Sequence, residues 1–256
     1  MIQQTKHYGW VPDLPDHRDL RYAVVRHAIL TKAVPPMIDL RAQCPEVYDQ
    51  GALGSCTANA IAGAFQFELM RQKQQVFNPS RLFIYYNERV MEGHIDEDSG
   101  AQLRDGIKSV ATQGVCDETL WPYEVSKFSK KPKKSLYTKA KKNQALQYTR
   151  LNNTAVNELK TCLASGNPFV FGFTVYESFQ GDKVAKTGIL HMPKKSESVL
   201  GGHAVMAVGY NDKKKAFIVR NSWGDGWGLK GYFFMPYSYI TSTDLADDFW
   251  TITQVE

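Results

Sequence analysis

Apolar residues recur at helical spacing in the first half of the chain. From Cys56 to about Lys73 there is no proline, and small and apolar residues fall on more than one face, which predicts a buried helix that begins at the cysteine. Two further helices are predicted near Pro79–Met91 and at Ala101–Thr112. The last one carries an apolar stripe made of Leu103, Ile107, Val110 and Ala111.

The second half of the chain has a different pattern. Runs of β-branched and aromatic residues alternate with Gly, Asn-Asp and Lys clusters, which is typical of strands joined by turns. Four strands are predicted, at Pro168–Tyr176, His203–Tyr210, Ala216–Arg220 and Gly231–Met235. Helices followed by an antiparallel sheet predict an α+β fold in two parts, with a ligand groove between the helical and the β part.

Prolines separate an N-terminal arm from the rest of the chain. Residues 10–16 read Trp-Val-Pro-Asp-Leu-Pro-Asp, an extended stretch, and Pro35-Pro36 ends the arm. We therefore expect an arm at 1–35 and one domain at 36–256. Its helical part covers about 36–125 and its β-rich part about 145–256, joined by a Lys-rich loop at 126–143.

The length and composition are those of a globular protein. With 256 residues and 43% hydrophobic residues, the chain can bury one large core or two modest ones. No apolar run of about 18 residues is present, so no transmembrane helix is expected. The first ten residues are too polar for a secretory signal peptide. The compartment stays open: secreted if a signal peptide has been removed, and cytoplasmic otherwise.

The net charge of +5 has a local origin. Eight lysines lie between Lys127 and Lys142 with no acidic residue among them, so the rest of the chain sums to about −3. A Lys-rich stretch that contains a proline is more often a solvated loop than a surface for membranes or nucleic acid. No zinc finger or aromatic RNA-binding strand accompanies it, and nucleic acid is not expected as a partner.

Three short motifs carry candidate chemistry. They are Gln50-Gly-Ala-Leu-Gly-Ser-Cys56, Gly201-Gly-His203-Ala-Val205 and Asn221-Ser-Trp-Gly224. A cysteine attacks as its thiolate, and a histidine beside it can take up the proton and stabilise the charge. In the first turn of a helix the Cys56 sulfur would lie near the positive end of the helix dipole, which predicts a lowered thiol pKa.

The strand pattern also predicts how the histidine and the asparagine meet. Residues 210–214 form a short polar turn between two strands, which indicates a hairpin. If the turn is centred on Asp212, residues whose numbers sum to 424 face each other. His203 and Asn221 would then be cross-strand neighbours on one face, whereas a slip of one residue would point Asn221 to the other face.

Each of these residues alone has a plainer interpretation. A lone Cys is usually a buried apolar residue, a lone His in a strand a core residue, and an Asn before Ser-Trp-Gly a turn residue. Their joint occurrence, in the order Gln, Cys, His, Asn, resembles the papain-like cysteine peptidases. That family carries its Cys near the mature N-terminus and its partners roughly 130 to 150 residues further on. The resemblance covers about residues 35–256.

The resemblance implies a role for each motif residue. Cys56 is the expected nucleophile, His203 its base and later acid, Asn221 the group that orients the imidazole, and Gln50 an oxyanion donor together with the Cys56 backbone N–H. The resemblance implies further residues at the substrate-binding groove: Gly54, Ser55, Ser99, Gly100, Gly202 and Trp223. The expected substrate is a peptide or protein, the expected oligomeric state is a monomer, and no cofactor or metal is expected.

The chain departs from the usual family pattern at several positions. Leu53 stands where many members carry a disulfide cysteine, Thr57 where an aromatic residue follows the nucleophile, and Glu97-Asp98-Ser99-Gly100 where Cys-Asn-Gly-Gly is usual. The other three cysteines, Cys44, Cys116 and Cys162, are an odd number that cannot all pair within one chain. We therefore expect a divergent member that lacks the usual disulfides.

The resemblance leaves three functions open. The absence of a paired-His loop between Ala101 and Trp121 favours an endopeptidase over a dipeptide-removing enzyme. The alternatives are a catalytically inactive scaffold that binds a peptide or partner, and an acyl transferase that resolves the thioester with an amine. Residues 1–35 occupy the place of a short propeptide, and they could either block the groove as in a zymogen or pack permanently on the body.

Overall fold

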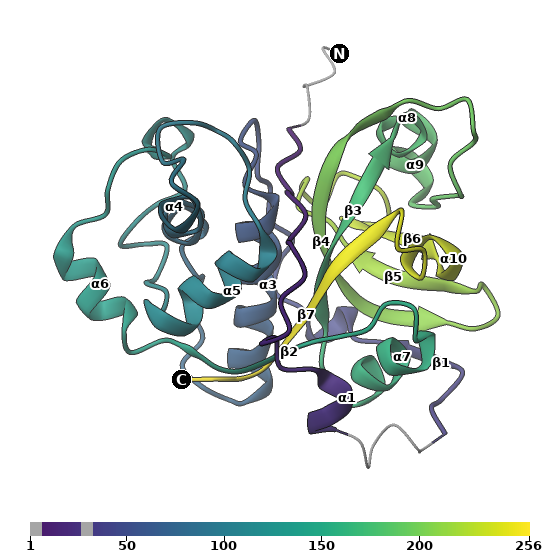
Figure 1. The fold of residues 1–256 in the computed structure, drawn as a ribbon, viewed down its shortest axis with the longest axis horizontal. Helices are drawn as coiled ribbons and strands as arrows, with labels where there is room; N and C mark the ends of the chain where they lie inside the picture. Colours follow the sequence, from purple (N-terminus) through teal and green to yellow (C-terminus); the bar gives the residue numbers. More distant parts are fainter. Residues whose placement is uncertain (1–6, 27–32) are drawn as a thin grey trace.

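The computed structural model describes residues 7–26 and 33–256, so residues 1–6 and 27–32 of the expected arm lie outside it. Figure 1 shows most of the helices on one side and the sheet on the other, with α3 between them and the purple N-terminal segment running along the boundary. The helices and 3-10 turns are α1 (Tyr22–Val25), η1 (Arg41–Gln43), α3 (Cys56–Arg71), α4 (Arg81–Glu92), α5 (Leu103–Thr112), η2 (Val125–Lys127), α6 (Lys134–Ala140), α7 (Val156–Ala164), α8 (Glu177–Gln180), α9 (Asp182–Thr187) and α10 (Tyr237–Ile240).

The β half is one antiparallel sheet in which six strands follow the order β2-β7-β3-β4-β5-β6 and β1 pairs with β4. The strands are β1 (Met37–Asp39), β2 (Ala145–Arg150), β3 (Phe169–Tyr176), β4 (Val199–Asn211), β5 (Ala216–Arg220), β6 (Tyr232–Pro236) and β7 (Ala246–Val255). The α+β fold and the four predicted strands are confirmed. Strands β1, β2 and β7 were not among the predictions.

Helix α3 is buried along most of its length, as predicted. Every residue from Cys56 to Leu69 is buried, because the helix packs on the sheet on one side and on α4 and α5 on the other. Small residues such as Ala60 and Gly63 permit this close approach. Helix α4 begins after Ser80, whose hydroxyl accepts a hydrogen bond from the Phe83 N–H. It ends before Gly93, which lies in the left-handed region.

The Lys-rich stretch is partly helical, which corrects the expectation of a loop throughout 126–143. Helix α6 forms within it because Leu136 and Ala140 find an apolar contact with Phe83 and Cys116. Burial of two side chains on one face is enough to stabilise a short helix in a tertiary setting. The lysines Lys133, Lys134, Lys141 and Lys142 remain exposed.

The predicted register of the β4–β5 hairpin was wrong, although the predicted face was right. The observed partners are Met206↔Arg220 and Ala207↔Val219, and beyond Val208 they become Gly209↔Ile218. The register shift at Val208 is a bulge-like irregularity, and one extra residue in one strand reverses the alternation of faces. If the pairing seen next to the turn continued along both strands, His203 and Asn221 would lie on opposite faces of the sheet. The shift at Val208 moves the pairing by one residue, so the two side chains lie on the same face.

Candidate active site

Cys56 opens helix α3, where the sequence predicts it. Its side chain is fully buried, and its Sγ accepts a hydrogen bond from the backbone N–H of Ala204 on β4 at 3.3 Å. The first turn of a helix has backbone N–H groups without intrahelical partners, and it therefore favours negative charge. The contact with Ala204 brings the sulfur next to the residue that follows His203.

His203 and Asn221 are bonded to each other. The Nε2 atom of His203 lies 2.8 Å from Oδ1 of Asn221, and the same oxygen accepts the backbone N–H of Ser222 at 2.8 Å. The Ser222 bond identifies Oδ1 as the oxygen end of the amide, so the imidazole carries a proton on Nε2. Nδ1 is then the ring nitrogen that can exchange a proton with a neighbouring thiol.

Trp223 shields this pair from water. Its ring is stacked on that of His203, with 5.0 Å between the ring centroids and 29° between the planes, and it is 5% exposed. Phe179 and Trp227 pack against the other parts of the Trp223 ring. A hydrogen bond is stronger in such an apolar surrounding than in water, so the aromatic residues hold the imidazole in one orientation.

Gln50 directs its amide nitrogen toward the same place. Its Oε1 accepts a hydrogen bond from the Ser222 hydroxyl at 2.7 Å, which fixes the amide orientation. Its Nε2 donates to the carbonyl of Leu53 at 2.9 Å and to the carbonyl of His7 at 3.2 Å. A side-chain N–H donor aimed at a carbonyl oxygen is the arrangement that an oxyanion hole requires.

The N-terminal segment, residues 7–26, runs along the boundary between α3 and the sheet (Figure 1). Beyond the bond from Gln50 to His7, the backbone N–H of Gly9 donates to the Cys56 sulfur. The backbone N–H of Trp10 donates to the carbonyl of Gly202 at 2.9 Å, and Ala101 exchanges hydrogen bonds of 2.7 and 3.0 Å with the residues on either side of Trp10. This is parallel strand-like pairing.

We call the residues that contact the segment here the segment-binding surface: Gly54, Cys56, Ala101, Gly172 and Gly202. Glycines make the approach possible. A Cβ on Gly9 would lie 1.7 Å from the carbonyl oxygen of Gly54. Gly100 has a φ of +74°, and a Cβ there would lie 2.2 Å from the Gly9 oxygen.

The Cys56 thiol differs from the sequence-based prediction of a lowered pKa. Burial raises its pKa to about 12, although the N–H groups of Ala204, Gly9 and Thr57 oppose the shift. Desolvation disfavours the thiolate more strongly than the helix N-terminus and these donors favour it. In this arrangement, with Gly9 on the sulfur, Cys56 is a protonated thiol at neutral pH.

The other predicted groove residues divide into two groups. The Gly54 carbonyl, Gly100, Gly202 and Trp223 all face the N-terminal segment; the Trp223 ring centroid is 6.2 Å from that of Tyr8. Ser55 and Ser99 do not face it. The Ser55 hydroxyl contacts the Tyr123 hydroxyl at 2.5 Å inside the helical half, and the Ser99 hydroxyl donates to the carbonyl of its neighbour Gly100 at 3.1 Å.

Sequence reasoning missed four residues around the site. Ala101 rather than Gly100 pairs with the segment backbone, Asp98 accepts the Gly54 N–H at 3.0 Å, and Gly9 and Trp10 supply the segment's closest contacts. Trp10 gave a usable signal, because a large apolar ring in a polar, proline-rich arm is expected to be buried against something. It is 8% exposed.

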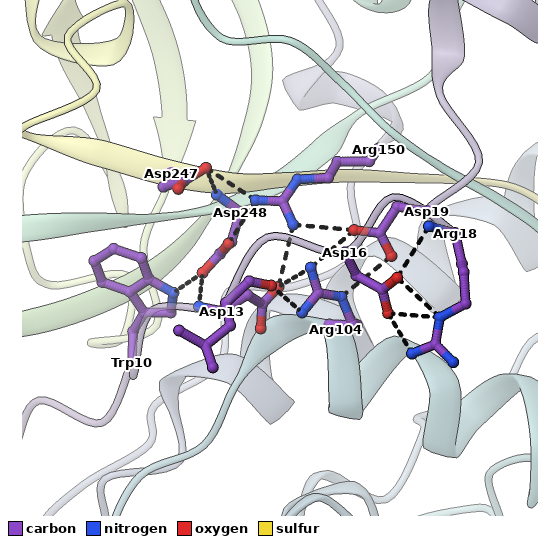
Figure 2. Close-up of polar contacts among 10 residues, drawn as sticks. Trp10, Asp13, Asp16, Arg18, Asp19, Arg104, Arg150, Asp247 and Asp248 are labelled. Atoms are coloured by element: carbon purple, nitrogen blue, oxygen red, sulfur yellow. Dashed lines mark hydrogen bonds and ion pairs between the residues drawn. The ribbon is translucent and has the colours of Figure 1, made fainter.

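A buried charged network holds the segment beyond Trp10 (Figure 2). Asp19 of the segment bonds Arg104 on α5 at 2.8 Å and Arg150 on β2 at 3.2 Å. The Asp13 carboxylate lies 3.9 and 3.6 Å from the same two guanidinium groups. Arg150 also bonds Asp248 on β7 at 2.9 Å. Arg150 therefore bridges acids of the segment and of the sheet, and Arg104 joins the segment acids to α5.

All four cysteines lie in the described part of the chain and are free thiols. The expectation that the usual disulfides are missing is therefore confirmed. Within residues 7–26 and 33–256, no group of three or more His, Cys, Asp or Glu is arranged to hold a metal ion. In the same ranges no helix has the length and apolar character that crossing a membrane requires.

Comparison with known proteins identifies the class. The model of the papain family cysteine proteases matches residues 34–250, so the chain belongs to that family, and it is a cysteine protease and hydrolase. The matched range begins after the N-terminal segment. It contains Gln50, Cys56, His203 and Asn221.

Two proteins are similar over almost the whole length. The crystal structure of xylellain, a cysteine protease from Xylella fastidiosa, superposes with a TM-score of 0.90 at 45% identity, covering 100% of this chain and 99% of that one. An uncharacterized peptidase C1-like protein of Acanthamoeba polyphaga mimivirus is 46% identical, over 98% of this chain and 88% of its own. Both similarities include the N-terminal segment. Digestive procathepsin L 3 of Tenebrio molitor, at 20% identity and a TM-score of 0.70 over 95% of this chain and 75% of that one, shares the fold.

Proposed function

We propose that this protease cleaves peptide bonds with Cys56 as nucleophile and His203 as its base. The observation that carries the proposal is the bond from His203 to Asn221 beside Cys56. With Nε2 held by Asn221, Nδ1 takes the thiol proton. The thiolate attacks the peptide carbonyl carbon, the amine leaves with the proton from His203, and water then hydrolyses the thioester to release the acid and the thiol.

The tetrahedral intermediate needs donors for its negative oxygen. The Gln50 amide is held by Ser222 with its N–H groups toward the site, and the Cys56 backbone N–H at the start of α3 is the second donor that we propose. One such donor contributes about 3 kcal/mol of transition-state stabilisation. The His7 carbonyl now accepts the Gln50 hydrogen bond, so a substrate carbonyl has to replace it.

We also propose that the N-terminal segment inhibits the enzyme. It occupies groups that the reaction or an extended substrate would use: Gln50 donates to His7, the Cys56 sulfur accepts from Gly9, and Gly202 accepts from Trp10. An extended substrate would have to bind this same surface as an added strand. The surface runs past Gly9 in both directions, which favours an endopeptidase.

The test uses full-length protein and an epoxysuccinyl peptide, which alkylates activated cysteines. Intact mass is followed for the native chain, for Cys56→Ala and for Gly9→Ala. A methyl group on Gly9 collides with the Gly54 carbonyl, so Gly9→Ala should lift the segment and speed both labelling and peptide hydrolysis about tenfold or more, the effect of losing roughly 1.4 kcal/mol of docking. Gly226→Ala is the matched control, because a Cβ there meets nothing within 4 Å.

The three variants separate the two parts of the proposal. Loss of all labelling in Cys56→Ala, with Cys162 and the other thiols unmodified, supports the nucleophile. Equal rates for the native chain, Gly9→Ala and Gly226→Ala would contradict inhibition by the segment. No labelling of any folded form would contradict the assignment of Cys56 as nucleophile.

A further inference from the structure

Trp10 occupies a built pocket in the segment-binding surface. The indole lies flat against two glycines: a Cβ on Gly172 would be 1.9 Å from the ring, and a Cβ on Gly202 would be 2.8 Å from it. At the far end the indole Nε1–H donates to Oδ2 of Asp248 at 3.0 Å (Figure 2). The pocket thus combines two flat walls with one buried acceptor.

Asp248 is held in place at a conformational cost. It lies on β7 with a φ of +60°, in the left-handed region that residues with a side chain seldom adopt. Its side chain is fully buried. Its backbone N–H donates to the neighbouring Asp247 carboxylate at 2.7 Å. Such a conformation aims the carboxylate at the indole.

The segment supplies both hydrogen bonds to one oxygen of this carboxylate. Oδ2 accepts from the Trp10 indole and from the backbone N–H of Asp13 at 2.8 Å, whereas Oδ1 accepts from Arg150 at 2.9 Å. When the segment leaves, a buried carboxylate oxygen loses its donors, and a buried acceptor without a donor is costly. A bound substrate that offers a donor at this point regains that energy.

We propose that Asp248 is a specificity-determining residue and that the pocket selects a tryptophan side chain of the substrate, the residue that Trp10 imitates. The inference rests on the proposed function, because it assigns a side-chain preference to the same site. The flat glycine walls fit an aromatic ring, and the carboxylate fits its N–H. A phenylalanine ring would pack against the two glycines but would offer no N–H to Oδ2 of Asp248.

The local charge argues against a basic side chain in the pocket. Arg150 already neutralises Asp248 through a direct bond, and Arg104 lies beside it in the same network. Without the segment, the body contributes Asp247 and Asp248 against these two arginines. A substrate arginine would therefore bring an unbalanced third cation to a buried site.

The activity test uses full-length Gly9→Ala protein and peptide pools that vary one residue at a time on the amino side of the cleaved bond. At the position that enters the pocket, tryptophan should exceed phenylalanine and arginine in kcat/KM by about tenfold, the scale of one hydrogen bond to a charged group. Asp248→Asn should reduce the ratio of kcat/KM for tryptophan peptides to kcat/KM for phenylalanine peptides. The matched control is Asp247→Asn, which alters a carboxylate that bonds Arg150 at 3.0 Å and does not contact the indole.

A second measurement does not depend on turnover. Trp10→Phe in the otherwise native full-length chain keeps a ring in the pocket and removes its N–H. The fraction of molecules with the segment released should rise about tenfold. This rise is measured as faster alkylation of Cys56 by iodoacetamide. In an Asp248→Asn background the same substitution should have a smaller effect, because a neutral amide oxygen accepts a weaker hydrogen bond than a carboxylate oxygen.

The outcomes are distinct. A Gly9→Ala enzyme that cleaves peptides with equal rates for tryptophan and phenylalanine, or that prefers arginine, overturns the specificity inference and leaves the proposed function standing. Unchanged alkylation in Trp10→Phe overturns it as well, even if Asp248→Asn fails to fold. A Gly9→Ala protein that is alkylated at Cys56 yet cleaves no peptide contradicts the proposed function instead.

Discussion

Glu88 is a carboxyl group buried behind Cys56. Its Oε2 accepts the Thr57 hydroxyl at 2.9 Å, and Thr57 is the residue directly after Cys56. Burial, together with the acids Glu92 and Asp105, raises the pKa of Glu88 well above its ordinary value. In the folded protein Glu88 therefore stays protonated at pH values where it is ionised in the unfolded chain.

This buried acid predicts a pH-dependent stability. The contribution of Glu88 is fully present below about pH 4.3, its unfolded pKa, and is lost as the pH rises toward the higher folded pKa. Glu88→Gln keeps the shape without the ionisation. It should match the native free energy of unfolding at pH 4 and exceed it by about 1–2 kcal/mol at pH 8, the scale of one buried polar group. Urea unfolding at both pH values measures this, and parallel pH curves for the two proteins would contradict it.

At the scale of elements, the junction between α5 and α6 depends on Gly114. Its φ is +74°, and a Cβ would lie 1.8 Å from the carbonyl oxygen of Ala140 at the end of α6. The next residue, Val115, exchanges hydrogen bonds with Asn143 at 2.9 and 3.1 Å. Gly93 after α4 has a similar φ of +79° with nothing within 4 Å.

The two glycines form a matched pair for a stability measurement. Gly93→Ala should cost about 1 kcal/mol, the strain of the left-handed region alone. Gly114→Ala should cost about 3 kcal/mol, because a clash with a backbone oxygen adds to the same strain. Chemical unfolding of both variants gives the difference. Equal losses would mean that α6 shifts freely and that its contact with Gly114 and Val115 after α5 contributes little.

The sequence predicted the elements whose pattern is local. Helix α3 follows from the proline-free run after Cys56, and β3 to β6 follow from their aromatic and β-branched runs. The register of the hairpin was not predictable, because the irregularity at Val208 depends on how β4 is shared with β1, β3 and β5. Strand β7 escaped prediction since its start, Asp247-Asp248, reads as polar loop.

The candidate site was also predictable in part, because some of its residues lie in local sequence motifs. Gln50, Cys56, His203 and Asn221 stand in motifs that are specific in themselves. The contact between Gly9 and Cys56 joins distant parts of the chain, and no local pattern encodes it. Burial raises the pKa of the Cys56 thiol against the effect of the Gly9 N–H, so sequence reasoning from the helix dipole alone predicted the opposite sign.

At the scale of the molecule, the N-terminal segment ties the two halves together through buried charges. Asp13 faces Asp248 on β7, Arg150 on β2 and Arg104 on α5, and Asp19 beside it bonds both arginines. Burial first, and the Asp248 carboxylate second, raise the pKa of Asp13, against the effect of the arginines. The docked segment therefore binds a proton that the released segment gives up.

This linkage predicts release of the segment at alkaline pH. The contribution of Asp13 to the docking free energy is fully present below about pH 3.9, the ordinary carboxyl pKa. It is lost as the pH rises through the raised pKa that Asp13 has in the docked segment. Alkylation of Cys56 is measured from pH 5 to 9 for the native chain and for Asp13→Asn, and the ratio of rates cancels the chemistry of the thiol. The ratio of the native rate to the variant rate should rise by about tenfold or more between the two ends of this range. A ratio that stays constant from pH 5 to 9 would contradict the linkage.

The Gly9 N–H that bonds the Cys56 sulfur belongs to the same polypeptide, and dilution therefore cannot weaken that contact. A tethered competitor acts at an effective concentration on the order of millimolar, whatever the amount of protein in the sample. If the segment inhibits the enzyme as proposed, a substrate meets only the fraction of molecules in which Gln50 and Cys56 are uncovered. If about one molecule in a hundred is uncovered, every substrate appears about a hundredfold weaker than its intrinsic affinity, and a partner that captures the released segment raises the rate without touching the catalytic residues.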